Sequence, residues 1–185
     1  MNNYNLKGID VIVIEKHAFM RRLLTDVLKT LGVSRIRETS DPEIAYELFK
    51  EKTADLVLTD WAPGLDGLQL LQKLRDADTS PDPFVPVIVV SANTEPHHIF
   101  LARDAGMMEF LAKPITAKRV YSRICSVIEK RHMFIRSDSF FGPDRRRRRK
   151  REHEGTERRR SGNKNGPERR MDQNPFYGKE RRADG

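Results

Sequence analysis

Five short strand-like runs, four of them apolar and the second one polar, alternate with five amphipathic segments along the first 135 residues, and this alternation restricts the fold more than any other feature. The runs occupy residues 9–14, 33–37, 55–59, 85–90 and 109–112. The segments between and after them keep the 3.6-residue period of helices that bury one face. Strands that are joined through helices by short loops pair in parallel through right-handed crossovers. The sequence therefore predicts a three-layer α/β domain with a five-stranded parallel sheet and helices on both faces.

Caps and apolar stripes locate the helices. Gly32 is predicted to stop the first helix, and Asp41 with Pro42 to open the second. The third helix is predicted to bury Leu68, Leu71 and Leu74, the fourth to run to about residue 106, and the fifth to span about 115–132. The predicted buried stripe of the second helix consists of Ile44, Ala45, Leu48 and Phe49.

The charge is distributed unevenly between two parts of the chain. Residues 1–135 hold 18 Lys+Arg and 18 Asp+Glu, whereas residues 136–185 hold 17 and 9, so the whole excess of +8 belongs to the tail. In the tail the apolar periodicity stops, and Gly, Pro, Ser and charged residues take over, which is typical of disorder. We therefore predict a folded domain over 1–135 and a disordered Arg-rich tail over 136–185.

The cysteine content and the lack of long apolar runs bear on the location of the protein. A single cysteine, Cys125, excludes an intramolecular disulfide and suits a reducing compartment. No apolar run approaches 18 residues, and the N-terminus lacks a basic segment followed by an apolar one. The expectation is a cytoplasmic protein with no membrane segment.

Polar residues stand at the ends of four predicted strands. They are Glu15 with Lys16, Asp60, Ser91 and Lys113. The carboxyl ends of parallel strands meet at one edge of the sheet, where ligands bind. A single polar strand end is most often a solvated edge, but four together match the needs of an acyl-phosphate site. Carboxylates there hold a divalent cation, and a hydroxyl and an ammonium bind the phosphoryl oxygens.

The chain resembles the receiver domain of two-component response regulators, of the chemotaxis type. The matching motifs are VIVIEK followed by MRRLL, LVLTDWAP followed by DGL, VIVVSA, and FLAKP, and they cover about residues 7–132. The resemblance implies a non-enzymatic signalling domain. Flavodoxin-like folds of this kind have the strand order 2-1-3-4-5, which the sequence by itself does not derive.

The resemblance also implies a role for each matching residue. Asp60 becomes the phosphoacceptor, Ser91 the switch hydroxyl and Lys113 the phosphate-binding lysine, followed by a cis peptide bond to Pro114. Phe110 stands at the aromatic switch position. Mg²⁺ is expected at Glu15, Asp60 and the backbone carbonyl of Ala62.

Three departures from the family pattern weaken the expected metal site or switch. Lys16 replaces the second acid of the family's strand-one pair, which is normally the direct metal ligand. The loop from Asp60 to Asp66 and Gly67 is one residue shorter than usual. The switch position carries Phe110, which has no hydroxyl, whereas tyrosine is common there.

Two functions follow from these departures. One is a receiver that accepts a phosphoryl group on Asp60 from a histidine kinase or phosphotransferase, with weak dependence on Mg²⁺ or none. The alternative is a non-phosphorylated pseudo-receiver adaptor that is held in one state by a Lys16–Asp60 contact and whose basic tail binds a partner protein or nucleic acid. At a separation of about 4 Å such a contact is worth roughly 4 kcal/mol before desolvation, for an effective dielectric constant of about 20.

The tail contains a repeat. The pattern Gly-x-acid-Arg-Arg begins at Gly142, Gly155, Gly166 and Gly178, at intervals of 13, 11 and 12 residues. Three interpretations remain open: a solvated basic tail, a set of short motifs that bind an acidic partner protein with avidity, or a segment that binds nucleic acid or an anionic membrane surface. The candidate anion-binding residues are Arg145, Arg146, Arg147, Arg148, Arg149, Lys150 and Arg151.

Overall fold

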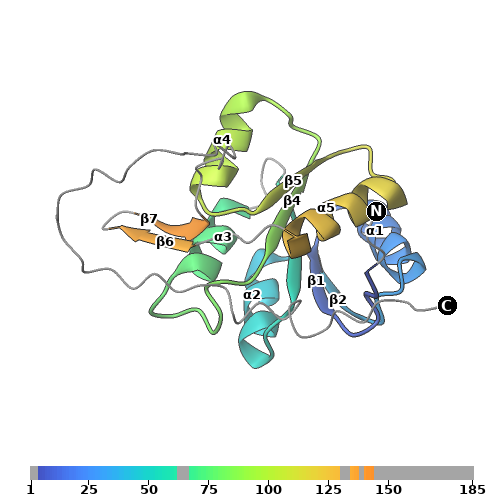
Figure 1. The fold of residues 1–185 in the computed structure, drawn as a ribbon, viewed down its shortest axis with the longest axis horizontal. Coiled ribbons are helices and arrows are strands. Elements are labelled where there is room, and N and C mark those ends of the chain that lie inside the picture. Colours follow the sequence, from blue (N-terminus) through green and yellow to red (C-terminus); the bar gives the residue numbers. More distant parts are fainter. Residues whose placement is uncertain (1–3, 62–66, 130–133, 138–139, 144–185) are drawn as a thin grey trace, which may run out of the picture.

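The computed structural model describes residues 4–61, 67–129, 134–137 and 140–143. Five parallel strands form one sheet in the order β2-β1-β3-β4-β5, which confirms the predicted fold class (Figure 1). The strands are β1 (Asp10–Ile14), β2 (Arg35–Thr39), β3 (Leu56–Asp60), β4 (Val87–Ser91) and β5 (Glu109–Ala112). The helices are α1 (Ala18–Thr30), α2 (Pro42–Glu51), α3 (Gly67–Arg75), α4 (Pro96–Asp104) and α5 (Ala117–Glu129).

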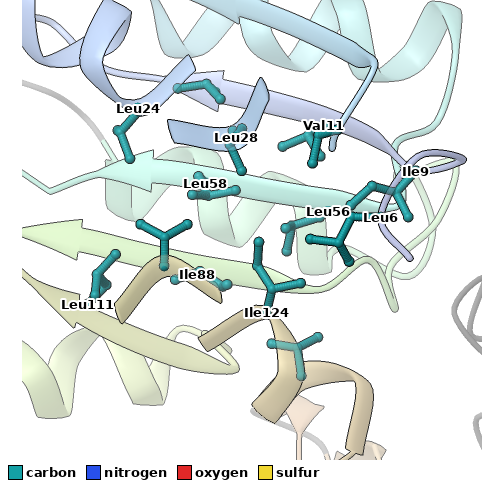
Figure 2. Packing of buried hydrophobic residues seen from close by; sticks show 14 of the residues in the cluster. Leu6, Ile9, Val11, Leu24, Leu28, Leu56, Leu58, Ile88, Leu111 and Ile124 are labelled. Atoms are coloured by element: carbon teal, nitrogen blue, oxygen red, sulfur yellow. The ribbon is translucent and has the colours of Figure 1, made fainter. Parts of the chain in front are cut away.

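Alternate strand residues feed two separate apolar cores. Val11 and Val13 of β1 point to one face, where they pack with residues of α1 and α5 such as Leu28 and Ile124 (Figure 2). Ile12 and Ile14 point to the other face, where residues of α2 and α3 cover them. The central strands β1, β3 and β4 are buried at every position, because helices cover both faces of a parallel sheet.

Capping residues in the sequence correctly predicted one end of each of two helices. The Asp41 carboxylate caps α2 by accepting hydrogen bonds from the backbone N–H groups of Glu43 and Ile44. Gly32 has a φ of 91° just after α1. That conformation is costly for residues with a Cβ, so glycine ends the helix there.

Some predicted positions were wrong. Ile44 is 53 % exposed, so it does not belong to the buried stripe of α2. In α3 the buried leucines are Leu70, Leu71 and Leu74, and Leu68 is only half-buried. Strand β2 begins at Arg35, two residues later than predicted. These errors arise because edge strands and short helices carry weaker periodicity than a fully covered strand.

A second, two-stranded antiparallel sheet follows the domain. It consists of β6 (Phe134–Ser137) and β7 (Phe140–Pro143), with Phe134 opposite Pro143. The sequence analysis did not predict these strands, which lie across the proposed boundary at residue 135. The division into a domain and a disordered tail remains a prediction.

A buried aspartate anchors the edge of the sheet where the strands begin. Asp10, the first residue of β1, is 5 % exposed. Its Oδ1 accepts from Arg37 Nε at 3.0 Å and Nη2 at 2.8 Å, and its Oδ2 accepts from Lys52 Nζ at 2.9 Å. Burial opposes ionisation, but the bonds from Lys52 and Arg37 hold the pKa of Asp10 below its usual value.

Candidate functional site

The opposite edge of the sheet, where the strands end, collects the predicted site residues. Asp60 is the last residue of β3 and Ser91 the last of β4, while Glu15 and Lys113 directly follow β1 and β5. The four strands that carry these residues are neighbours in the sheet, because β1 pairs with β3, β3 with β4, and β4 with β5. Parallel pairing therefore brings all four residues to one edge, as the sequence predicted.

Lys113 joins the two carboxylates of this site. Its Nζ lies 2.7 Å from Glu15 Oε2 and 2.9 Å from Asp60 Oδ1. The side chains of Glu15 and Asp60 are 0 % and 1 % exposed, and that of Lys113 is 15 % exposed. One partly buried ammonium thus binds two buried carboxylates, which leaves the three side chains with a formal charge of −1 when all are ionised.

The two oxygens of Asp60 differ in their surroundings. Oδ1 binds Lys113, whereas Oδ2 is buried and has no hydrogen-bond partner in the described part of the chain. A buried polar atom without a partner is uncommon in folded proteins and often marks a functional group. Oδ2 is therefore the atom of this edge that is best placed to meet a ligand.

The pKa values of the site reflect this imbalance. Burial raises the pKa of Asp60, Lys113 works against that rise, and the Glu15 carboxylate adds to it. Burial alone would lower the pKa of Lys113, but its bonds to Glu15 and Asp60 raise it. Lys113 therefore stays cationic, whereas the ionised form of Asp60 is disfavoured.

Backbone contacts hold the remaining site residues in place. Ser91 Oγ donates to the Trp61 carbonyl at 2.7 Å and accepts from the Asn93 N–H at 3.1 Å. The peptide bond between Lys113 and Pro114 is cis, as expected. Phe110 is half-buried in β5, next to Val89 of β4.

A family model for the response regulator receiver domain matches residues 11–125. The chain belongs to the response regulator receiver domain family. Receiver domains are signalling modules of two-component systems that interact with histidine kinases or phosphotransferases, and they generally bind Mg²⁺ at an acidic pocket.

Relatives of this receiver domain include chemotaxis proteins. Chemotaxis protein CheY-3 of Vibrio cholerae is 27 % identical over 125 residues, which cover 67 % of this chain and 95 % of that protein. Chemotaxis protein CheY of Pseudomonas aeruginosa is 27 % identical over 121 residues, which cover 65 % and 96 %. The family-model match ends at residue 125, before the Arg-rich tail.

Solved structures support the fold. Chemotaxis protein CheY4 of Vibrio cholerae matches with a TM-score of 0.58 at 17 % identity, over 64 % of this chain and 98 % of that one. A response regulator from Thermotoga maritima matches with a TM-score of 0.58 at 21 % identity, over 66 % and 98 %. In the described part of the chain, no helix is long and apolar enough to cross a membrane.

The residues of this receiver domain fit a directly bound divalent cation poorly. Mg²⁺ requires close to octahedral oxygen coordination. Within the described residues, no group of three or more His, Cys, Asp or Glu side chains could hold a metal ion. Glu15 and Asp60 are the two carboxylates present, and Lys113 already binds both. Of the four oxygens of these two carboxylates, only Asp60 Oδ2 has no partner among the described residues.

Lys16 does not lie where the pseudo-receiver hypothesis required it. Its side chain is exposed, and the ion pairs among the described residues include no Lys16–Asp60 contact. The lysine that binds Asp60 is Lys113. The predicted contact joined the wrong lysine to Asp60, because sequence order cannot show which of two strand-end lysines turns inward.

Two predicted elements fall outside the described residues. Ala62, whose carbonyl was predicted to bind metal, lies in the gap 62–66, and the basic run 145–151 lies beyond residue 143. The predictions for these residues stay predictions.

Sequence reasoning missed two supports of Glu15. The Glu15 carboxylate accepts a hydrogen bond from the His17 N–H at 2.9 Å, and the Glu15 carbonyl accepts one from Arg21 Nη1 at 2.7 Å. Arg21 lies in the MRRLL motif, to which the sequence analysis gave no role at the site. The spacing of six residues from Glu15 to Arg21 is the signal that points to this contact, since the side chain reaches back over the first turn of α1.

Proposed function

We propose that this receiver domain accepts a phosphoryl group on Asp60 from the phosphohistidine of a histidine kinase or a histidine phosphotransferase, and that it signals by protein–protein interaction. The observation that carries the proposal is the asymmetry of the Asp60 carboxylate. Oδ1 is held by Lys113 at 2.9 Å, while the buried Oδ2 has no hydrogen-bond partner among the described residues. A carboxylate fixed through one oxygen presents the other as a nucleophile.

The transfer is an in-line displacement at phosphorus. Asp60 Oδ2 forms a bond to phosphorus while the N–P bond of the donor breaks. The imidazole nitrogen keeps the electron pair, and the neutral donor histidine is restored after it takes up a proton. The ammonium of Lys113 lies beside the acceptor, where it offsets negative charge on the transferring phosphoryl oxygens.

Ser91 and Phe110 connect the site with the surface in this proposal. The Ser91 hydroxyl now donates to the Trp61 carbonyl. Phosphoryl oxygens on Asp60 are stronger acceptors than a carbonyl and compete for this hydroxyl. A turn of Ser91 toward Asp60 changes the packing of β4 against β5, where Phe110 is half-buried, and so changes the face formed by α4 and β5.

The test is labelling of the full chain with radioactive acetyl phosphate, both with MgCl₂ and with a chelator. We expect one label per chain that hydroxylamine releases, because an acyl phosphate reacts with that nucleophile. Asp60→Asn should carry no label. Asp26→Asn, an exposed carboxylate on α1, is the matched control and should be labelled like the wild type. A hydroxylamine-sensitive label that persists in Asp60→Asn would contradict the proposal.

The second candidate is a non-phosphorylated adaptor, and the presence of Lys16 in place of the family's second acid favours it. Under this function, acetyl phosphate leaves no label on any variant. A partner captured by the full chain would then bind wild type and Asp60→Asn with equal affinity.

A further inference from the structure

The distribution of positive charge around Asp60 differs from that of a site built for a divalent cation. Lys113 already bridges Glu15 Oε2 and Asp60 Oδ1 at 2.7 and 2.9 Å. Lys16 follows Glu15 directly and is exposed, and among the described residues its side chain takes part in no hydrogen bond or ion pair. The site therefore has one engaged ammonium and a second, unengaged one at the end of the neighbouring strand.

A charge count shows what Lys16 does in this setting. An acid at position 16 together with Mg²⁺ would bring −1 and +2, a sum of +1. Lys16 alone brings the same +1 without any metal. With Asp60 phosphorylated, the pocket has the same formal charge in both arrangements, so the lysine supplies the neutralisation for which the family uses a cation.

We infer that Lys16 takes the place of the divalent cation, so that the phosphoryl group on Asp60 is held between the ammonium groups of Lys16 and Lys113 and phosphorylation needs no metal. This inference rests on the proposed function of Asp60. A lysine ammonium offers three N–H donors and no acceptor, which suits phosphoryl oxygens. Its long side chain is rotatable, so Lys16 can turn from solvent toward the Oδ2 side of Asp60 when the anion arrives.

The first experiment measures Mg²⁺ binding without any chemistry. Trp61 is the only tryptophan, follows Asp60 directly and is bonded through its carbonyl to Ser91, so its fluorescence reports on the site. MgCl₂ is titrated at constant ionic strength into full-length wild type, Lys16→Asp and Lys7→Asp, and calorimetry repeats each titration. Lys7 is an exposed lysine just before β1, at the opposite edge of the sheet, and serves as the control for charge reversal.

We expect Lys16→Asp to bind Mg²⁺ at least about 100-fold more tightly than the wild type and Lys7→Asp. Loss of an outer-sphere group alone typically costs 10- to 100-fold in metal affinity, and here a direct ligand is gained while a cation is lost. Equal affinity of wild type and Lys16→Asp would overturn the inference. So would a failure of both to bind by calorimetry, because Lys16 would then not be what excludes the metal.

The second experiment measures the label from acetyl phosphate. Wild type should be labelled at the same rate with MgCl₂ or chelator, and Lys16→Asp only with MgCl₂. Lys16→Gln, which has neither the ammonium nor the acid, should be labelled at least about tenfold more slowly than the wild type under both conditions.

The outcomes separate this inference from the proposed function. Wild type labelled only in the presence of MgCl₂ would keep Asp60 as the phosphoacceptor and overturn the role of Lys16. A wild type that takes no label under either condition would overturn both phosphorylation and the phosphoryl-binding role of Lys16. The Mg²⁺ titration would still decide separately whether Lys16 excludes the metal.

Discussion

Two buried aspartates lie at opposite ends of the strands of the same sheet and differ in how completely their carboxylates are hydrogen-bonded. Asp10 begins β1, and both of its oxygens are bound, one by Arg37 and the other by Lys52. Asp60 ends β3, and one of its oxygens has no hydrogen-bond partner among the described residues. The pKa of Asp10 is lowered and that of Asp60 is raised. Asp10 therefore stabilises the fold, whereas the charged form of Asp60 is destabilised by its surroundings.

The hydrogen bonds of the partners explain the difference. Arg37 is itself fixed, because its Nη1 donates to the carbonyls of Leu48 at 2.6 Å and Lys52 at 2.7 Å. It ties β1, β2 and the end of α2 together through Asp10. Lys113 instead divides its charge between Glu15 and Asp60. A buried ion pair adds to stability only where the geometry and the remaining hydrogen bonds repay the desolvation of both charges.

The largest expected effect is a loss of stability in Asp10→Asn. The amide cannot accept the full set of charge-assisted bonds from Arg37 and Lys52, so we expect the free energy of unfolding to fall by about 2–3 kcal/mol. Urea unfolding followed by circular dichroism measures it. Asp26→Asn is the control, because Asp26 is exposed and pairs with Arg22 only at 4.0 Å. A change in Asp10→Asn no larger than in the control would remove Asp10 from the structural role.

The opposite sign is expected for Asp60→Asn. The substitution removes a carboxylate whose pKa is raised, and Lys113 keeps its bond to Glu15. At pH 7 we expect the free energy of unfolding to rise by about 0.5–2 kcal/mol, the usual range for a single stabilising substitution. The same urea experiment measures it. A destabilised Asp60→Asn would mean that the bond to Lys113 outweighs the burial of the charge.

Most of the fold was predictable from the sequence, because covered parallel strands leave unbroken β-branched runs and helices leave a 3.6-residue period. Prediction of β5 at 109–112 agreed with the structure. Ile44 was wrong because an apolar side chain at helical spacing can still face solvent on a helix that covers only part of a sheet. The β6–β7 pair was missed because its short strands were read as the start of the tail.

The site was predictable as a set of strand ends but not as a set of contacts. Parallel pairing alone brings Glu15, Asp60, Ser91 and Lys113 together. The bridging position of Lys113 depends on side-chain rotamers, which the sequence does not determine. Asp10 was missed as a structural residue, since it looked like a single polar interruption of an apolar strand. Its partners lie 27 and 42 residues further along the chain.

The third prediction sharpens the comparison through pH. Asp10 has a lowered pKa, so the stability it contributes is complete above the ordinary value of 3.8 and is lost as the pH falls below it. Asp60 has a raised pKa, so its destabilisation is complete above that raised value and disappears as the pH falls toward 3.8. As the pH falls from 7, the difference in the free energy of unfolding between wild type and Asp60→Asn should therefore disappear before pH 3.8 is reached. The difference between wild type and Asp10→Asn should disappear only below pH 3.8.

Urea unfolding of the three proteins between pH 7 and pH 2.5 measures both differences. Asp26→Asn, run alongside, should follow the wild type throughout. Differences that disappear over the same pH interval would contradict the assignment of opposite pKa shifts to the two aspartates.

The smallest effect concerns the neighbour that contributes to the raised pKa of Asp60. Burial is the main cause of that rise, and the Glu15 carboxylate adds to it. In Glu15→Gln this repulsion is gone, and Lys113 directs its charge mainly to Asp60, so the pKa of Asp60 should move down toward its ordinary value. Carbon-13 NMR titration of the aspartate carboxyls measures the shift, with the Asp60 signal assigned by its absence in Asp60→Asn. Glu47→Gln removes an exposed carboxylate that pairs with Lys50 and should leave the titration unchanged. An Asp60 signal that titrates at the same pH in Glu15→Gln as in the wild type would show that burial alone destabilises the Asp60 carboxylate, and that the sharing of Lys113 with Glu15 plays no part in it.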